Sequence, residues 1–126
     1  MTKFATPDGT KKYVARFAGR AAAGHFREQQ GLQLSSLGIG TYLGEPDART
    51  DQAYTDAIVA AVEAGANVID SAINYRFQRS ERSVRAALEE NRASTCDKYA
   101  GRTTAIFSGS TMAWTAWVAS ASVCTA

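Results

Sequence analysis

The sequence is poor in the residue types that mark several classes of protein. Among its 126 residues are 2 cysteines, 2 prolines and 1 histidine. Cys96 and Cys124 have no metal-binding spacing and no histidine or cysteine beside them, so we predict two reduced thiols and no metal site. Because reduced thiols are typical of intracellular proteins, we expect a cytoplasmic protein.

Long apolar runs and a strong net charge are also missing. No apolar run approaches the roughly 20 residues that a membrane-spanning helix needs, and the N-terminus lacks the apolar centre of a secretion signal. The net charge of +2 is too small to indicate binding to nucleic acid or to a membrane surface. We therefore expect a small globular chain with neither as a partner.

The first of three predicted segments, residues 1–31, is a basic and alanine-rich N-terminal extension. Gly19 and Gly24 disfavour a long helix, so we predict short pieces and turns held by aromatic anchors. Those anchors are Tyr13, Phe17 and Phe26. A solvated extension is the favoured interpretation, and an organellar transit peptide is the alternative. The lone His25 is interpreted as a packed or solvated residue and not as a ligand.

The second segment, residues 32–92, begins with two predicted strands. Leu32 and Leu34 alternate with polar residues, which is typical of a short strand. Residues 37–41 predict a second and more buried strand, in which Gly38 and Gly40 allow another backbone or a ligand to approach closely. The two glycines do not form a dinucleotide fingerprint, because the third glycine and an immediate helix are absent.

A helix is predicted next, with Thr50 or Asp51 as its N-terminal cap and Gly65 as its end. Its apolar face consists of Tyr54, Ala57, Ile58, Ala61 and Val62, at helical spacing. The residues that follow, 67–71, are short, apolar and β-branched, and predict a buried strand. Helix, glycine and strand in this order indicate a parallel α/β arrangement.

Within the strand 67–71, Val68 and Asp70 share one face and Ile69 takes the other. A carboxylate is costly to bury without a partner, so we place Asp70 at the mouth of the strand. Tyr75 follows on the next loop, which in parallel (β/α) barrels lies on the catalytic face. The pattern therefore predicts a phenol near a carboxylate at the end of a strand.

Ser80 is predicted to cap a further helix whose buried stripe is Val84, Ala87 and Leu88. Glu81 and Arg85 have the spacing of a weak helical ion pair. Four arginines lie in this region, at positions 76, 79, 82 and 85. A solvated helix face is the favoured interpretation of these arginines, and phosphate binding is the alternative.

These motifs resemble the opening of an aldo/keto reductase. The matching stretches are Leu37-Gly-Ile-Gly-Thr-Tyr42, Ala64-Gly65, Val68-Ile-Asp-Ser-Ala-Ile-Asn-Tyr75 and Ser80-Glu81, within residues 32–90. The resemblance implies a (β/α)8 barrel that reduces a small-molecule aldehyde or ketone by hydride transfer from NADP(H). The predicted fold class is therefore α/β, a truncated TIM-barrel fragment with the first two βα units, an N-terminal extension and an irregular tail.

The resemblance also implies roles for individual residues. Tyr75 matches the general acid that protonates the carbonyl oxygen, and Asp70 matches the carboxylate that pairs with a catalytic lysine. Gly40, Thr41 and Tyr42, together with Asp70, match the residues that lie against the nicotinamide ribose. Without the resemblance, Asp70 and Tyr75 would be interpreted as a strand-end carboxylate and an aromatic residue at the edge of the core.

The third segment, residues 93–126, departs from the family pattern. It contains only three charged residues, Asp97, Lys98 and Arg102, and no recognisable lysine strand or histidine strand. Lys98 lies near the position expected for the catalytic lysine, but the residues before it do not resemble a strand, so it is not favoured. Residues 103–107 and 112–118 could pair as a hairpin around Ser108-Gly109-Ser110.

The change of composition at this point suggests a shifted reading frame, with a divergent end as the alternative. A (β/α)8 barrel needs about 250 residues, so we predict that the chain is inactive as a reductase. Two other functions remain open: a non-catalytic truncated interaction module, and an unrelated small α/β domain.

Overall fold

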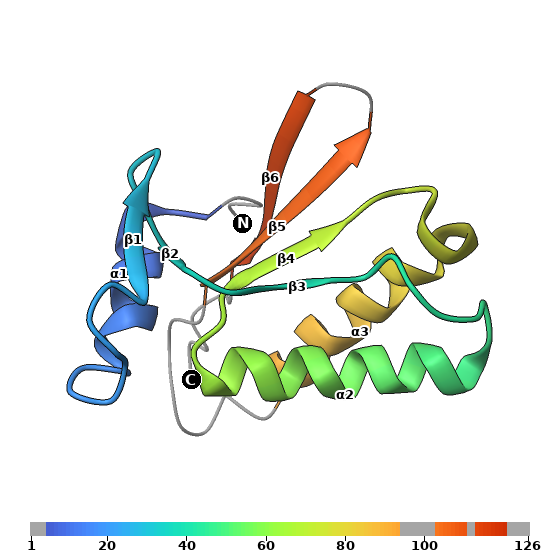
Figure 1. The fold of residues 1–126 in the computed structure, drawn as a ribbon, viewed down its shortest axis with the longest axis horizontal. Helices are drawn as coiled ribbons and strands as arrows, with labels where there is room; N and C mark the ends of the chain where they lie inside the picture. Colours follow the sequence, from blue (N-terminus) through green and yellow to red (C-terminus); the bar gives the residue numbers. More distant parts are fainter. Residues whose placement is uncertain (1–4, 94–102, 111–112, 121–126) are drawn as a thin grey trace.

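The structure, a computed structural model, describes residues 5–93, 103–110 and 113–120. Its elements are α1 (Pro7–Ala15), β1 (Phe26–Gln29), β2 (Leu32–Ser35), β3 (Gly38–Gly40), α2 (Ala48–Ala64), β4 (Val68–Ser71), the short turn η1 (Tyr75–Gln78), α3 (Arg79–Ala93), β5 (Thr103–Ser110) and β6 (Ala113–Ser120). Helices α2 and α3 lie side by side along one side of β3 and β4, and α1 lies with the β1–β2 hairpin at one end (Figure 1). The chain is thus a small mixed α/β domain.

The larger sheet has the strand order β3-β4-β5-β6. Strands β3, β4 and β5 are parallel, with Ile69 in register with Ile39 on one side and with Ile106 on the other. Strand β6 returns antiparallel to β5, which confirms the predicted hairpin, although Ser108–Ser110 lies inside β5 and not in the turn. The tail is therefore not irregular throughout, because β5 occupies the open edge of β4; the predicted tail residues 94–102, 111–112 and 121–126 lie outside the described residues.

Helix α2 begins earlier than predicted. Its N-terminal cap is Asp47, whose Oδ1 accepts a hydrogen bond from the Thr50 backbone N–H at 2.7 Å. The predicted caps, Thr50 and Asp51, lie inside the first turn, because Ala48 and the residue after it are good helix formers and extend the helix upstream. The predicted end is confirmed: Gly65 has φ of 111°, a conformation that suits glycine.

The N-terminal segment supplies part of the hydrophobic core. Tyr13 is fully buried, and its hydroxyl donates a hydrogen bond to the Val62 carbonyl oxygen at 2.6 Å. Phe17 is buried beside it, with the two ring centroids 5.2 Å apart. The core also contains Ile58, Val62, Ile69, Val84 and Ala87. The solvated extension is therefore a wrong interpretation, although the short helix and the aromatic anchors Tyr13 and Phe17 are confirmed.

A buried asparagine joins the β1–β2 hairpin to the start of β4. Asn67 accepts a hydrogen bond from Ser35 N at 2.8 Å and donates one to the Gln33 carbonyl oxygen at 2.9 Å. Its own backbone N–H donates to Ser35 Oγ at 2.9 Å. A buried amide is stable only when its hydrogen bonds are satisfied, and here the partners come from β2. The predicted strand at Leu32 is confirmed, and this contact fixes where it lies.

Candidate functional site at the carboxyl ends of β3 and β4

The predicted site residues converge because β3 and β4 are parallel neighbours. Gly40 is in register with Asp70, so the loops that follow both strands leave the sheet at the same edge. The Thr41 hydroxyl donates a hydrogen bond to the Asp70 carbonyl oxygen at 3.0 Å, and Thr41 is fully buried. Thr41 therefore joins the ends of β3 and β4. Because it is fully buried, the solvent-accessible surface at this edge belongs to adjacent residues.

Two tyrosines meet above this junction. The rings of Tyr42 and Tyr75 lie with centroids 5.0 Å apart and planes at 70°, an edge-to-face contact. Tyr42 is 65% exposed and Tyr75 is half-buried. Edge-to-face contact is a favoured geometry for aromatic pairs and restricts where both rings can lie. The pair brings together one residue predicted for cofactor binding and one predicted for catalysis.

The environment of Asp70 follows the predicted alternation of β4. Ile69 and Ser71 are buried, whereas Val68 and Asp70 are half-buried on the other face. Among residues 5–90, the part of the chain with described side chains, the structure shows no ion pair to the Asp70 carboxylate. Lys98 lies outside these residues, as do both cysteines.

The two glycines of β3 differ in their surroundings. A Cβ placed on Gly38 would lie 3.0 Å from the Val68 side chain and from its carbonyl oxygen, so Gly38 permits close packing of β3 on β4. A Cβ on Gly40 would meet nothing within 4 Å. Gly40 therefore borders open space at the mouth of the site, where a ligand could approach the backbone.

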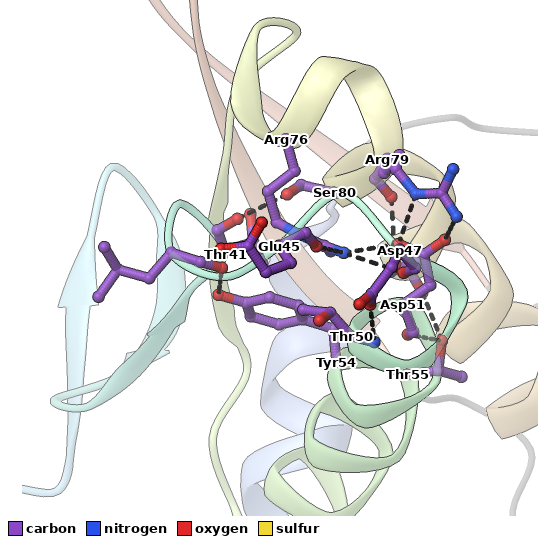
Figure 2. Close-up of polar contacts among 12 residues, drawn as sticks. Thr41, Glu45, Asp47, Thr50, Asp51, Tyr54, Thr55, Arg76, Arg79 and Ser80 are labelled. Atoms are coloured by element: carbon purple, nitrogen blue, oxygen red, sulfur yellow. Dashed lines mark hydrogen bonds and ion pairs between the residues drawn. The ribbon is translucent and has the colours of Figure 1, made fainter.

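Arg76 is buried, whereas the sequence predicted it on a solvated helix face. Its side chain is 1% exposed, and its Nε and Nη2 donate to the Glu45 carbonyl oxygen at 3.1 and 2.8 Å. Nη2 also lies 2.8 Å from Asp51 Oδ1, and the guanidinium carbon lies 5.0 Å from the centre of the Tyr54 ring. Figure 2 shows this side chain reaching from the loop after β4 to the beginning of α2. It is not part of a solvated helix face.

Arg79 shares the same carboxylate. Its Nη2 lies 2.6 Å from Asp51 Oδ2, and its Nε donates to Oδ1 at 3.2 Å. Burial raises the pKa of Asp51, but hydrogen bonds and charge from Arg79 and Arg76 outweigh this effect, so the pKa lies below its ordinary value of 3.8. Both arginines are therefore committed to an internal carboxylate, which argues against phosphate binding by them.

The other two arginines behave as predicted, but the predicted ion pair does not form. Arg82 and Arg85 are exposed on α3. Arg85 Nε lies 2.9 Å from Glu89 Oε1, so it pairs one turn towards the C-terminus and not with Glu81. Glu81 and Glu89 both lie four residues from Arg85, and the ion pair forms with Glu89.

The turn that carries Arg76 has an unusual backbone. Arg76, Phe77 and Gln78 have φ values of 48°, 54° and 68°. Left-handed geometry costs a residue with a side chain roughly 1–2 kcal/mol, so three in succession store several kcal/mol of strain. Such strain persists only where neighbouring contacts impose it, and the hydrogen bonds of the buried Arg76 guanidinium lie at this turn.

Two further hydrogen bonds fasten the loops together. Ser80 Oγ donates to the Thr41 carbonyl oxygen at 2.6 Å, and Tyr54 Oη donates to the Leu43 carbonyl oxygen at 2.7 Å. Ser80 was predicted as the cap of α3, but the helix begins at Arg79 and the serine is buried in its first turn. Its hydroxyl is drawn to Thr41 because that carbonyl lies beside the helix start.

Large apolar side chains remain exposed around the tyrosine pair. Among the described side chains, the exposed large hydrophobic residues are Leu37, which precedes β3, and Tyr42, Leu43, Ile73 and Phe77, which form an apolar rim. Four of these lie in the loops after β3 and β4, and Phe77 is 81% exposed at the tip of the strained turn. This apolar rim was not predicted from the sequence, because its members belong to loops without periodicity.

A separate cavity of about 250 Å³ lies at the other end of α2. It is lined by Phe17, Arg20, Ala21, Ala22, His25 and Ala64. His25 Nε2 lies 3.1 Å from the Gly65 carbonyl oxygen, and because a carbonyl can only accept, Nε2 carries the proton. The ring also contacts Phe26 edge to face at 4.5 Å. The prediction of a packed histidine is confirmed.

The described residues form neither a metal site nor a membrane-spanning helix. No group of three or more histidine, cysteine, aspartate or glutamate side chains in that part of the chain is arranged to hold a metal ion. None of its helices has the length and apolar character needed to cross a lipid bilayer. Comparison of the chain with protein-family models, curated proteins and solved structures finds no match.

Proposed function

We propose that β3, α2, β4 and α3 are the first two βα units of a barrel of the aldo/keto reductase type. The site at their carboxyl ends would then serve NADP(H)-dependent reduction of an aldehyde or ketone. The observation that carries this proposal is the contact of Tyr42 with Tyr75, which lie in the loops that follow the registered pair Gly40 and Asp70. In parallel barrels, catalytic residues come from the carboxyl ends of several strands.

The surroundings of Gly40 and Tyr42 support the proposal of a site for the nicotinamide end of the cofactor. Gly40 borders open space and Tyr42 is exposed beside it, so a flat ring and its ribose could lie against this edge. Arg76 and Arg79 are bound to Asp51 and do not serve the cofactor phosphates. When bound, NADPH supplies the hydride.

The roles of the chain's own groups follow from their positions. Tyr75 donates its phenolic proton to the carbonyl oxygen, and its ring is held by Tyr42. Asp70 at the strand mouth offers a carboxylate to a cationic partner. General-acid catalysis contributes roughly 10²–10⁴-fold, and it needs the proton donor within hydrogen-bond reach of the substrate.

The test is a fluorescence titration of NADPH with the 126-residue chain. We expect a change of cofactor fluorescence with the unchanged protein and its loss in Gly40→Val, whose side chain fills the open space beside β3. Ala60→Val, at an exposed position of α2, is the matched control and should bind like the unchanged protein. Absence of any change at millimolar NADPH, corresponding to a binding free energy weaker than about 4 kcal/mol, would contradict the proposal.

A non-catalytic interaction module is the second candidate. The observation that favours it is the rim of exposed apolar side chains, with Leu43 and Phe77 the most exposed. Such clusters on a protein surface often mark binding sites for other proteins. Light scattering separates the two candidates. An interaction module should self-associate or aggregate through the rim, and Phe77→Ser should reduce this association. Cofactor binding at Gly40 should be unaffected by Phe77→Ser.

A further inference from the structure

The loop after β4 combines two unfavourable features. Arg76, Phe77 and Gln78 all have positive φ, and the Arg76 Nη1 atom is buried without a hydrogen-bond partner among the described residues. Each feature destabilises the folded chain, and neither is needed to reverse the direction of a loop. Features of this kind indicate that the loop conformation serves a purpose other than stability.

The contacts of Arg76 show what the conformation achieves. Its guanidinium reaches across the site to the Glu45 carbonyl oxygen and Asp51, which lie before and within the first turn of α2. Tyr75 is the residue directly before it, and the Tyr75 ring contacts Tyr42 on the loop that leads to Glu45. Tyr75 and Arg76 are adjacent residues of the loop after β4. Both therefore contact the loop after β3, Tyr75 through its ring and Arg76 through its guanidinium.

We propose that Arg76 is a positioning residue, whose buried guanidinium holds the loop after β4 in its left-handed turn and thereby fixes the Tyr75 ring against Tyr42. When the guanidinium is removed, the strained turn relaxes to ordinary backbone angles and the ring of Tyr75 leaves Tyr42. The role of Tyr75 as a general acid rests on the proposed function. The contact between the two rings can be tested independently of that function, because it is measured on the protein without cofactor.

Two variants separate positioning from a general structural role. Arg76→Met keeps an unbranched side chain of similar reach but removes the charge and every donor. Arg76→Lys keeps the charge, but its single ammonium group lacks the planar fork that bonds Glu45 and Asp51 together. Arg85→Met removes an exposed arginine from α3 and is the matched control.

The measurement is the nuclear Overhauser contact between the rings of Tyr42 and Tyr75, recorded with amide hydrogen exchange. We expect Arg76→Met to lose the ring contact and the exchange protection of residues 76–80, while the core contact of Tyr13 with Phe17 persists. Arg76→Lys should weaken the ring contact, and Arg85→Met should leave it intact. Adding Phe77→Gly to Arg76→Met should not raise the unfolding midpoint, because the relaxed turn no longer holds residue 77 at positive φ, and it should not restore the ring contact.

Three outcomes would overturn the inference. One is an unchanged ring contact in folded Arg76→Met, and another is an equal loss in Arg85→Met. The third is loss of the Tyr13–Phe17 contact in both Arg76 variants, because this would show that the guanidinium maintains the whole fold and not the loop. A failure of NADPH binding in the unchanged protein affects none of these readings, so the two proposals fail separately.

Discussion

Replacing Asp51 by asparagine tests the charge balance of the site. Asparagine has nearly the same shape, but it leaves the buried Arg76 without a counter-charge. Removing one partner of a buried ion pair costs about 3–5 kcal/mol, and the low end applies here because the Asp51 side chain is 30% exposed. Arg79 is 28% exposed and its share of the pair is small, about 0–1 kcal/mol, while Arg76 keeps the Glu45 carbonyl. We therefore expect a loss of about 3 kcal/mol for Asp51→Asn at pH 7.

The assay is urea unfolding followed by circular dichroism. With a slope of about 1.5–2 kcal/mol per molar urea, a loss of about 3 kcal/mol lowers the midpoint by roughly 1.5–2 M. The control is Asp56→Asn, at an exposed position of α2 whose carboxylate accepts a hydrogen bond from Gln52 at 2.8 Å. We expect a change of only a few tenths of a kcal/mol there.

The pH dependence of this difference gives a second check. Because the pKa of Asp51 is lowered in the folded state, its charge stabilises the protein above the ordinary value of 3.8. This stabilisation is lost as the pH falls below 3.8 and through the folded pKa, where the carboxyl group becomes neutral like asparagine. The gap between unchanged protein and Asp51→Asn should therefore close in acid. Two results would refute the reasoning. One is a loss of stability below about 1 kcal/mol for Asp51→Asn at pH 7, and the other is a difference between the two proteins that is the same at pH 7 and in acid.

Three further predictions concern other parts of the chain. Tyr13→Phe should destabilise the fold by about 1 kcal/mol in urea unfolding, because it removes the hydrogen bond to Val62; no effect would show that the N-terminal segment is not docked. Phe77→Gly should raise stability by roughly 0.5–1 kcal/mol, because glycine accepts φ of 54° without strain; a decrease would show that the ring packs on something. The isolated chain should reduce no simple aldehyde with NADPH, and a rate that disappears in Tyr75→Phe would contradict this.

The parts of the fold that follow local rules were predictable from the sequence. Gly65 ends α2 because a left-handed residue is needed there, and the alternation of Ile69 with Asp70 along β4 follows from strand geometry. Tyr42 and Tyr75 were assigned to one site by resemblance, and parallel pairing of β3 with β4 brings them together.

The parts that depend on distant contacts were not predictable. Arg76 is buried only because the backbone turns left-handed and because Asp51 lies across the site, and neither condition has a signature in the residues around it. Asn67 has no local pattern that shows its partners on β2. The sequence of strand β5 lacks a clean alternation of apolar and polar residues. It nevertheless pairs with β4, because the edge of a sheet presents unpaired backbone N–H and C=O groups that another strand can bond.

The proposed site for the nicotinamide end of the cofactor lies at the carboxyl ends of β3 and β4. The most direct measurement is a titration of the ¹⁵N-labelled chain with NADPH, followed through its backbone amide resonances. We predict shifts confined to residues 40–43 and 70–75, with the amides of Ala60 and of the cavity residue Ala22 unchanged. Shifts centred on Ala22, or no shifts at millimolar cofactor, would contradict the account.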